Sequence, residues 1–506
     1  MPAASQFVAL AIVLIASSFR HPAIRLPGPT AVAPTARDLV LASAEALGGL
    51  ERLRAMRAIR VDEIGREYLV STITRRDAPP RLISQIVSTL RSARDSALRL
   101  TLVQTLPMRS GAITSVTVAS GGAVASVRGA TVVPATAFDL ATTLEEFALT
   151  PDWVLLTALD APDLRLQRDT TLGGVAHHVV SLGVADAPVR LFIDAASGFP
   201  TRVELVRAYP TNVFWAMWGD LRLVTTWSSW AVDGGVWYPR QRAVSLNGAP
   251  FREYQVTALA IDPDISADSV AIPDSVRRAF EQRVRSELTA AARGGAPPVK
   301  PVEIADGVVL YEGGYQSTAV RQHDGVVIIE APESAAKSRT VLADVGHRWP
   351  GLRVKAVVST SPMWMHIGGL REYAARGVPI YALDVNVPVV QALLDAPHRQ
   401  SPDSLARRPV KGIVRPVRDR LVIGSGDERL ELVPARGQHA SSMMLVWHPA
   451  DRLLYASDII VPDAFEPVFT AAYRSELERI VRREGLDVAR VYSEHLPVAT
   501  WNGGGR

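Results

Sequence analysis

Hydrophobic residues near the start of the chain follow two different patterns. Residues Phe7 to Ala16 form an unbroken apolar run, which is too short to span a bilayer but matches the core of an export signal. From Ala36 to Leu47 the apolar residues recur every three or four positions and the pattern stops at Gly48-Gly49, which predicts an amphipathic helix. We therefore expect a leader over residues 1–36 and export to the periplasm or the cell exterior. An uncleaved anchor or a buried N-terminal segment are the alternatives, because no Lys or Arg precedes the run.

The next two hundred residues change to a period of two. From Ile59 to about Ile261, alternating apolar and polar residues are interrupted by turn signals such as Gly121-Gly122, Gly234-Gly235 and Asn247-Gly248. This pattern predicts a large antiparallel sheet, followed by a helix from Ser275 to Arg293. The predicted N-terminal domain covers residues 37–293.

A new pattern begins after the Gly- and Pro-rich residues 294–298. Strands are predicted at Val308 to Tyr311, Ser317 to Val320 and Val326 to Ile329. A helix from Ala335 to Val345 and a strand from Val354 to Val358 follow, so strands and helices alternate. The second predicted domain covers residues 294–506, and the chain as a whole is expected to be α+β.

Composition narrows the chemistry that the chain can perform. The 506 residues suit two or three domains, and 48% hydrophobic content is that of an ordinary globular protein. The sequence has no cysteine, which excludes disulfides, thiolate ligands and a lipid anchor on cysteine, so any metal ligand must be His, Asp or Glu. The net charge is only +4 and is spread along the chain, so no nucleic-acid partner is expected.

Two phrases in the first domain suggest its shape. Phe192-Ile193-Asp194 before Ser197-Gly198-Phe199-Pro200, and the segment from Val232 to Pro239, are similar to strand-turn units of periplasmic lipoprotein carriers. The resemblance implies a curved antiparallel half-barrel with a helical cap, whose concave face holds a lipid or is filled by a packed core. We favour the packed core, because a fold alone does not confer a ligand.

A motif in the second domain carries a more specific resemblance. The segment from Val357 to Gly369 reads VVSTSPMWMHIGG and aligns without gaps with the V-V-x-T-H-x-H-x-D-H-x-G-G pattern of the metallo-β-lactamase superfamily. In that frame Ser361 and Met363 replace two histidines, Met365 replaces the aspartate, and His366 is retained. The motif therefore resembles the family's metal-binding segment with most of its ligands replaced.

Three later segments match the family in the expected order. Gly437-Gln438-His439 resembles the next histidine segment, the strand ending at Asp458 resembles the one that carries a bridging aspartate, and Glu494-His495-Leu496-Pro497 resembles the last histidine segment. The resemblance implies an αββα sandwich and the candidate ligand set His366, His439, Asp458 and His495.

This ligand set suits at most one metal ion. One family position would keep only His439, whereas the other would keep His366 and His495 with Asp458 nearby, enough for one zinc or iron ion. The resemblance then implies a mononuclear hydrolase in which metal-activated water attacks an ester, lactam or phosphoester, with Asp458 and His439 as catalytic residues.

A site without metal is the competing interpretation. Met363, Trp364 and Met365 could fill the altered pocket with apolar packing. The protein would then be a non-catalytic pseudoenzyme or an envelope protein that binds a small-molecule or lipidic ligand, touching membranes only through its leader.

Overall fold

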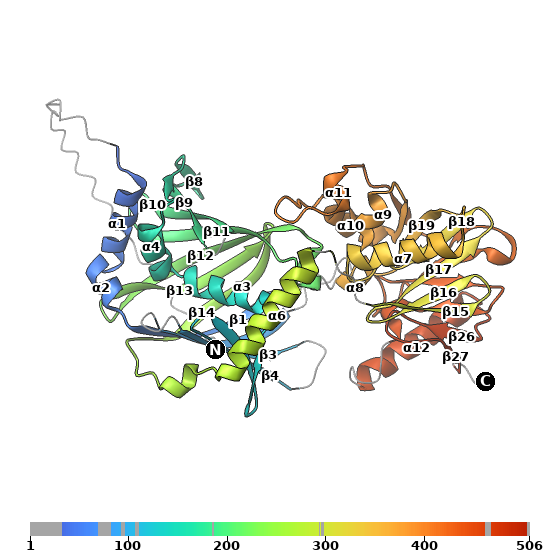
Figure 1. Cartoon of the computed structure of the whole chain (residues 1–506), viewed down its shortest axis with the longest axis horizontal. Helices are drawn as coiled ribbons and strands as arrows, with labels where there is room; N and C mark the ends of the chain where they lie inside the picture. The colour runs from blue at the N-terminus through green and yellow to red at the C-terminus, as the bar shows by residue number, and fades with distance from the viewer. Residues whose placement is uncertain are drawn as a thin grey trace, which may run out of the picture.

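The computed structural model describes residues 33–68, 82–92, 97–106, 111–184, 187–292, 294, 298–460 and 467–502. The protein has the expected mixed α+β composition, with one large sheet in its N-terminal half and two smaller sheets in its C-terminal half (Figure 1). The apolar leader predicted over Phe7 to Ala16 lies outside the described residues, so export stays a prediction. Within the described segments, no helix is both long enough and apolar enough to span a membrane.

The N-terminal half is built on an antiparallel sheet of fourteen strands. Its strands are β1 (Ala58–Tyr68), β2 (Leu82–Ser92), β3 (Ala97–Thr105), β4 (Ile113–Ser120), β5 (Ala123–Arg128), β6 (Thr131–Pro134), β7 (Arg165–Leu166), β8 (Thr170–Leu172), β9 (Val175–Val184), β10 (Ala187–Asp194), β11 (Pro200–Ala208), β12 (Asp220–Asp233), β13 (Val236–Leu246) and β14 (Ala249–Ile261). The strand order is β6-β5-β4-β3-β2-β1-β14-β13-β12-β11-β10-β9-β7, with β8 also paired to β9. Pairing of β1 with β14 joins two meanders into one continuous sheet.

Helices pack on this sheet through apolar side chains. They are α1 (Ala36–Leu47), α2 (Leu50–Ala55), α3 (Ala137–Ala148), α4 (Pro151–Asp160), α5 (Val213–Ala216) and α6 (Asp274–Ala292). The predicted helix α1 is confirmed, and it begins at a capping box in which Thr35 and Asp38 satisfy each other's backbone amides. Its buried residues Val40 and Leu47 share a core with Leu155 of α4 and Leu191 of β10. The sheet and these helices thus enclose one apolar core at this end of the domain.

The C-terminal half contains a seven-stranded and a six-stranded sheet. The first runs in the order β15 (Lys300–Ala305), β16 (Val308–Glu312), β17 (Ser317–Gln322), β18 (Gly325–Ile329), β19 (Val354–Ser359), β20 (Ile380–Leu383) and β21 (Val414–Val417). The second runs in the order β22 (Leu421–Ile423), β23 (Leu430–Pro434), β24 (Met444–His448), β25 (Leu453–Tyr455), β26 (Arg490–Tyr492) and β27 (Ala499–Thr500). The predicted strands at 308–311, 317–320, 326–329 and 354–358 are confirmed.

The alternation of side chains in these strands places the two sheets face to face. The helices are α7 (Ala335–Arg348), α8 (Trp364–Ile367), α9 (Leu370–Ala374), α10 (Val387–Asp395), α11 (Ser404–Arg407) and α12 (Pro467–Arg483). In β16, Val309 and Tyr311 pack with residues of α7, α9 and α10, whereas Val308 and Leu310 pack with the six-stranded sheet. Leu477 of α12 packs on the far side of that second sheet. Helices therefore cover both outer faces of the paired sheets.

The two halves contact each other through α5 and the start of β12. The Asp220 carboxylate accepts the backbone N–H groups of Arg399 (2.9 Å) and Gln400 (3.0 Å), and the Asp220 amide donates to the carbonyl of Pro397 at 2.7 Å. Beside this contact, the Phe214 ring on α5 lies 5.7 Å from the Trp364 ring on α8. The N-terminal half thus reaches the helix that carries the retained histidine of the sequence motif.

Candidate metal centre

Ends of parallel strands bring distant carboxylates to one place. The pairs β18–β19 and β25–β26 are parallel, so each pair delivers its carboxyl ends to the same edge. Glu330 follows β18, Asp458 lies just after β25, and Glu494 lies just after β26. The backbone amide of Met444 in the second sheet donates to Thr360 of the first at 2.9 Å, which links the two edges.

Helix α8 is held against this edge by a close approach of two glycines. A Cβ on Gly368 would lie 2.3 Å from the carbonyl oxygen of Glu333, and one on Gly369 would lie 2.1 Å from Ser338 Oγ. Only glycine therefore allows the chain after α8 to pack so tightly on the turn beyond β18. This packing fixes His366, whose side chain is fully buried.

Three buried carboxylates surround the His366 imidazole. Its Nε2 lies 2.7 Å from Asp458 Oδ2 and 2.8 Å from Glu494 Oε2, and its Nδ1 lies 3.2 Å from Glu330 Oε2. One N–H cannot point at two acceptors equally, and the hydrogen bond goes to Asp458. Both oxygens of Glu494 and Oε2 of Glu330 are buried with no hydrogen-bond donor among the described residues. The site therefore holds more carboxylate oxygen than its own donors satisfy.

Glu330 is anchored from the other side by hydroxyl groups. Its Oε1 accepts from the Thr360 amide at 3.0 Å and from the Thr360 hydroxyl. That hydroxyl lies 2.7 Å from Ser457 Oγ, on the residue before Asp458. Both Glu330 and Ser457 have positive φ, 67° and 52°, a conformation that costs free energy in non-glycine residues. These contacts hold Glu330 beside His366 and hold Ser457 against Thr360.

Burial and charge shift the ionisation of these groups in opposite directions. Burial alone would lower the pKa of His366, but the negative charges of Asp458, Glu494 and Glu330 outweigh it, and the pKa lies well above its ordinary value. Burial opposes ionisation of Asp458 as well, yet hydrogen bonds and charge from His366 and His495 hold the pKa of that carboxyl below its usual range. Burial raises the pKa of Glu494 to about 8 despite the nearby His366.

His495 and two aromatic rings pack beside Asp458. His495 Nε2 lies 3.0 Å from Asp458 Oδ1, and its ring lies 5.3 Å from the Tyr315 ring. Tyr315 in turn packs edge-on against Trp364 at 5.0 Å. The loop that carries Tyr315 is fixed by Lys337, a buried side chain whose Nζ donates to the carbonyls of Gly313 and Tyr315. His495, Tyr315 and Trp364 are half-buried, so solvent reaches the site in part beside these side chains.

The structure brings together three of the four ligands expected from the sequence. His366, Asp458 and His495 meet as described, with Asp458 between the two imidazoles. His439 is placed differently: its ring lies 5.2 Å from the Tyr473 ring of α12, and its backbone amide donates to Glu476. Among the described residues, the group with ligand atoms within 4.8 Å of one another is His366, Asp458 and Glu494, and neither His439 nor His495 belongs to it.

Residues that replace the family's ligands have other contacts. Ser361 Oγ donates to Asp458 Oδ2 at 3.4 Å, so it adds a weak hydrogen bond to the same carboxylate. Met363 and Met365 are half-buried. The proposal from sequence that these methionines fill a dry pocket does not account for the carboxylates that lie beside His366.

Sequence reasoning missed Glu330 and Glu494. Both were visible as acidic residues directly after buried strands, the first after Val326 to Ile329 and the second directly before His495. The alignment with the metallo-β-lactamase pattern pointed only to positions where that pattern has a ligand, and neither glutamate lies at such a position. For Glu494, the available signal was its position directly before the expected ligand His495.

The donor set suits a single divalent metal ion. Zinc and iron both accept imidazole nitrogen and carboxylate oxygen, and His366, Asp458 and Glu494 offer these atoms within 4.8 Å. The buried carboxylate oxygens without donors are the groups that a cation would satisfy. His495 lies outside this group and contacts the second oxygen of Asp458, Oδ1, at 3.0 Å.

Comparisons with known proteins leave the family open. No family model matches the chain, and no curated protein matches it. Among solved structures, TMB-1 is 15% identical with a TM-score of 0.32, and the match covers 41% of this chain and 94% of that one. The metallo-β-lactamase from Pontibacter korlensis is also 15% identical at 0.32, covering 40% and 94%. The DIM-1 metallo-β-lactamase is 12% identical at 0.32, covering 40% and 92%. Likenesses of this size concern part of the chain and establish no function for it.

Proposed function

We propose that this protein is a metal-dependent hydrolase with one metal ion held by His366, Asp458 and Glu494, and with His495 beside it. The observation that carries the proposal is the arrangement of three buried carboxylates around one buried imidazole. A doubly protonated His366 offsets the charge of only one carboxylate, so each further carboxylate that ionises beside it adds a buried negative charge. Such charge is costly to bury without a cation, and a divalent ion offsets it.

A bound zinc or iron ion would supply Lewis acidity and a water of lowered pKa. Residues of the chain would orient the ligands and transfer protons. Glu330 Oε2 lies 3.2 Å from Nδ1 of His366, and its negative charge favours the ring orientation in which Nε2 faces Asp458 and Glu494. His495 and Asp458 lie at the open side, where they can hold and move a proton near the substrate.

The aromatic rings beside Asp458 favour a substrate with an apolar group next to the bond that is cleaved. Tyr315 and Trp364 provide ring faces there, and Phe214 extends them from the other half of the chain. Esters, lactams and phosphoesters are the substrate classes that we propose. A catalytic role for His439 stays a prediction. Its ring lies 5.2 Å from the Tyr473 ring.

Metal content tests the binding part of the proposal. Protein purified without chelator is expected to contain about one zinc or iron per chain by elemental analysis, and the His366→Ala and Glu494→Gln variants should lose it. His448→Ala is the matched control, because His448 is another buried histidine in contact with a carboxylate, Asp451 at 2.8 Å, at the opposite end of β24 from Met444. The assignment would be refuted if the wild-type protein contained no metal after zinc and iron had been supplied, or if all variants contained the same amount of metal per chain.

Turnover tests the hydrolase part. A 4-nitrophenyl ester, a chromogenic lactam and bis(4-nitrophenyl) phosphate represent the three classes, each measured with metal-loaded, chelated and reloaded protein. Hydrolysis of at least one probe should fall on chelation, return on reloading, and fall in Asp458→Asn. Loaded wild type that is inactive on all three, or Asp458→Asn with unchanged activity, would count against hydrolysis while leaving metal binding intact.

A further inference from the structure

A separate cavity lies inside the N-terminal half. It has a volume of about 140 Å³, is partly open to solvent, and is lined by residues of α3, α5 and the sheet strands β1, β2 and β11 to β14. Apolar walls come from Trp215, Trp227 and Phe251, with the rings of Trp215 and Phe251 edge-on at 5.7 Å. Hydroxyl groups come from Thr89, Thr142, Thr150 and Thr225. The lining therefore combines flat apolar surfaces with uncharged polar groups.

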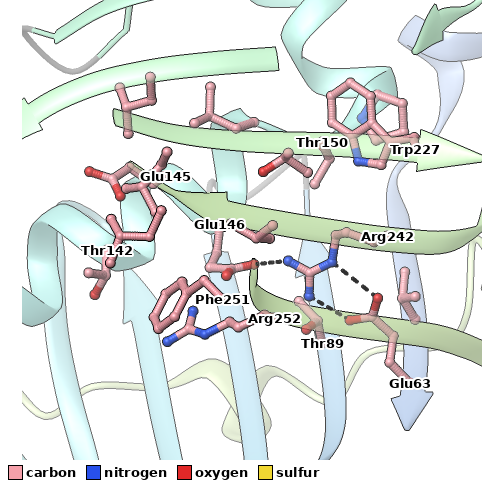
Figure 2. A pocket seen from close by; sticks show the side chains of 18 of the residues that line it. Glu63, Thr89, Thr142, Glu145, Glu146, Thr150, Trp227, Arg242, Phe251 and Arg252 are labelled. Carbon is pink, nitrogen blue, oxygen red and sulfur yellow. Dashed lines mark hydrogen bonds and ion pairs between the residues drawn. The ribbon is translucent and has the colours of Figure 1, made fainter. Parts of the chain in front are cut away.

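Charged residues also line the cavity, and the central one is fully paired. The Arg242 guanidinium lies between Glu63 and Glu146, at 2.8 Å and 3.3 Å (Figure 2). Its planar group also lies 4.5 Å above the Tyr254 ring. The pKa of Arg242 is raised well above its ordinary value, since the charges of Glu63 and Glu146 outweigh the effect of burial. Arg242 is thus committed to groups of the protein itself.

The remaining charges are paired in the same way. Arg91 contacts Asp152 at 3.0 Å, and Arg252 contacts Glu67 at 2.7 Å. Glu145 accepts from Arg207 at 3.0 Å and from the Tyr209 hydroxyl at 2.7 Å. The charged lining residues are three acidic and three basic: Glu63, Glu145, Glu146, Arg91, Arg242 and Arg252. A ligand with net charge would need a counter-charge taken from one of these buried pairs, and breaking such a pair is costly.

We propose that this cavity is a binding site for a small, uncharged molecule with a flat apolar body and a hydrogen-bonding group. Its volume of about 140 Å³ is close to the roughly 150 Å³ of an apolar cavity that admits benzene. The aromatic walls match a planar body. The threonine hydroxyls match a hydroxyl or carbonyl, and the balanced ion pairs disfavour a charged group.

Two probes with the same ring system test the charge preference. 2-Naphthol is neutral at pH 7 and 2-naphthoate is an anion, so their binding to the full-length protein, measured by calorimetry and by saturation-transfer NMR, differs through the charge. Saturable binding of 2-naphthol is expected, with 2-naphthoate weaker by at least about tenfold. Absence of 2-naphthol binding, or equal binding of the two, would overturn the proposal.

Neighbouring threonines on β12 locate the binding. Thr225 lines the cavity whereas Thr226 is exposed on the opposite face of the strand. Thr225→Trp should fill the cavity and abolish 2-naphthol binding, and Thr226→Trp should retain it. Thr142→Trp, which fills the same space from α3, replaces Thr225→Trp if that variant does not give the wild-type circular dichroism spectrum. Binding that survives both cavity-filling changes, or is lost in Thr226→Trp, would show that the naphthol binds elsewhere.

Discussion

Removing the Asp220 carboxylate should loosen the contact between the two halves of the chain. Asp220 is buried at the start of β12 and accepts the backbone N–H groups of Arg399 and Gln400 from the C-terminal half. In Asp220→Ala both amides lose a charged acceptor. Because Asp220→Asn keeps one oxygen acceptor, it should have an intermediate effect.

The expected cost follows from the number and exposure of these hydrogen bonds. A hydrogen bond to a charged group contributes about 1.5 to 3 kcal/mol, and two of them would give about 3 to 6 kcal/mol if fully buried. Arg399 and Gln400 are exposed residues, so water can reach their amides in part. We therefore expect the Asp220→Ala change to lower the free energy of unfolding by about 2 to 3 kcal/mol.

Urea unfolding followed by tryptophan fluorescence measures this change. Asp233→Ala is the control, because Asp233 ends the same strand but forms a solvent-exposed pair with Arg240 at 3.2 Å, worth about 0 to 1 kcal/mol. Equal effects of the two variants on the unfolding midpoint would refute the reasoning. If Asp220→Ala left the free energy of unfolding unchanged, water would be replacing the carboxylate as acceptor without loss of stability.

Three further predictions concern the same contact and the metal centre. Gly219→Ala should lower the unfolding temperature more than Gly235→Ala does. Both glycines have positive φ, but only at Gly219 would a Cβ lie 2.0 Å from the carbonyl oxygen of Pro397. Equal shifts in unfolding temperature would contradict that close approach. Burial lowers the pKa of His398, whose Nε2 lies 3.1 Å from the Met217 carbonyl, so its contribution to stability is complete above the unfolded pKa of about 6.5 and is lost as the pH falls through the folded value. Unfolding free energies from pH 8 to 5 should therefore fall more steeply in wild type than in His398→Gln, and parallel curves would argue against it. Zinc added to chelated protein at 100 times its dissociation constant should stabilise the fold by about 2.7 kcal/mol, whereas no rise in unfolding temperature, or the same rise in His366→Ala, would argue against a specific site.

Much of the local structure could be predicted because side-chain periodicity reports which face of an element is buried. The helix from Ala36 to Leu47 matches α1, and the predicted helix from Ala335 ends three residues later than expected, at Arg348. The pairing of β1 with β14 could not be predicted, because strands with the same alternation fit many partners and only the packed sheet selects one. The half-barrel shape and the likeness to lipoprotein carriers stay predictions.

The candidate site was predictable only where a motif marked it. His366, Asp458 and His495 were found from their segments, but the distances between them depend on how two sheets meet, which no local pattern records. Glu330 and Glu494 were missed because in a sequence a buried glutamate looks like any surface glutamate. The role of His439 stays a prediction, and its ring lies 5.2 Å from the Tyr473 ring.

Helix α5 is only four residues long, yet its two adjacent aromatic residues serve both halves of the chain. Phe214 lies against Trp364 of α8, the helix that carries His366, whereas Trp215 lines the cavity of the N-terminal half. Excising the C-terminal half at the 293–298 junction would therefore uncover Trp364 and remove part of the wall that a substrate meets. A molecule bound beside Trp215 would therefore lie one residue along the chain from Phe214, the side chain that contacts Trp364 of the other half.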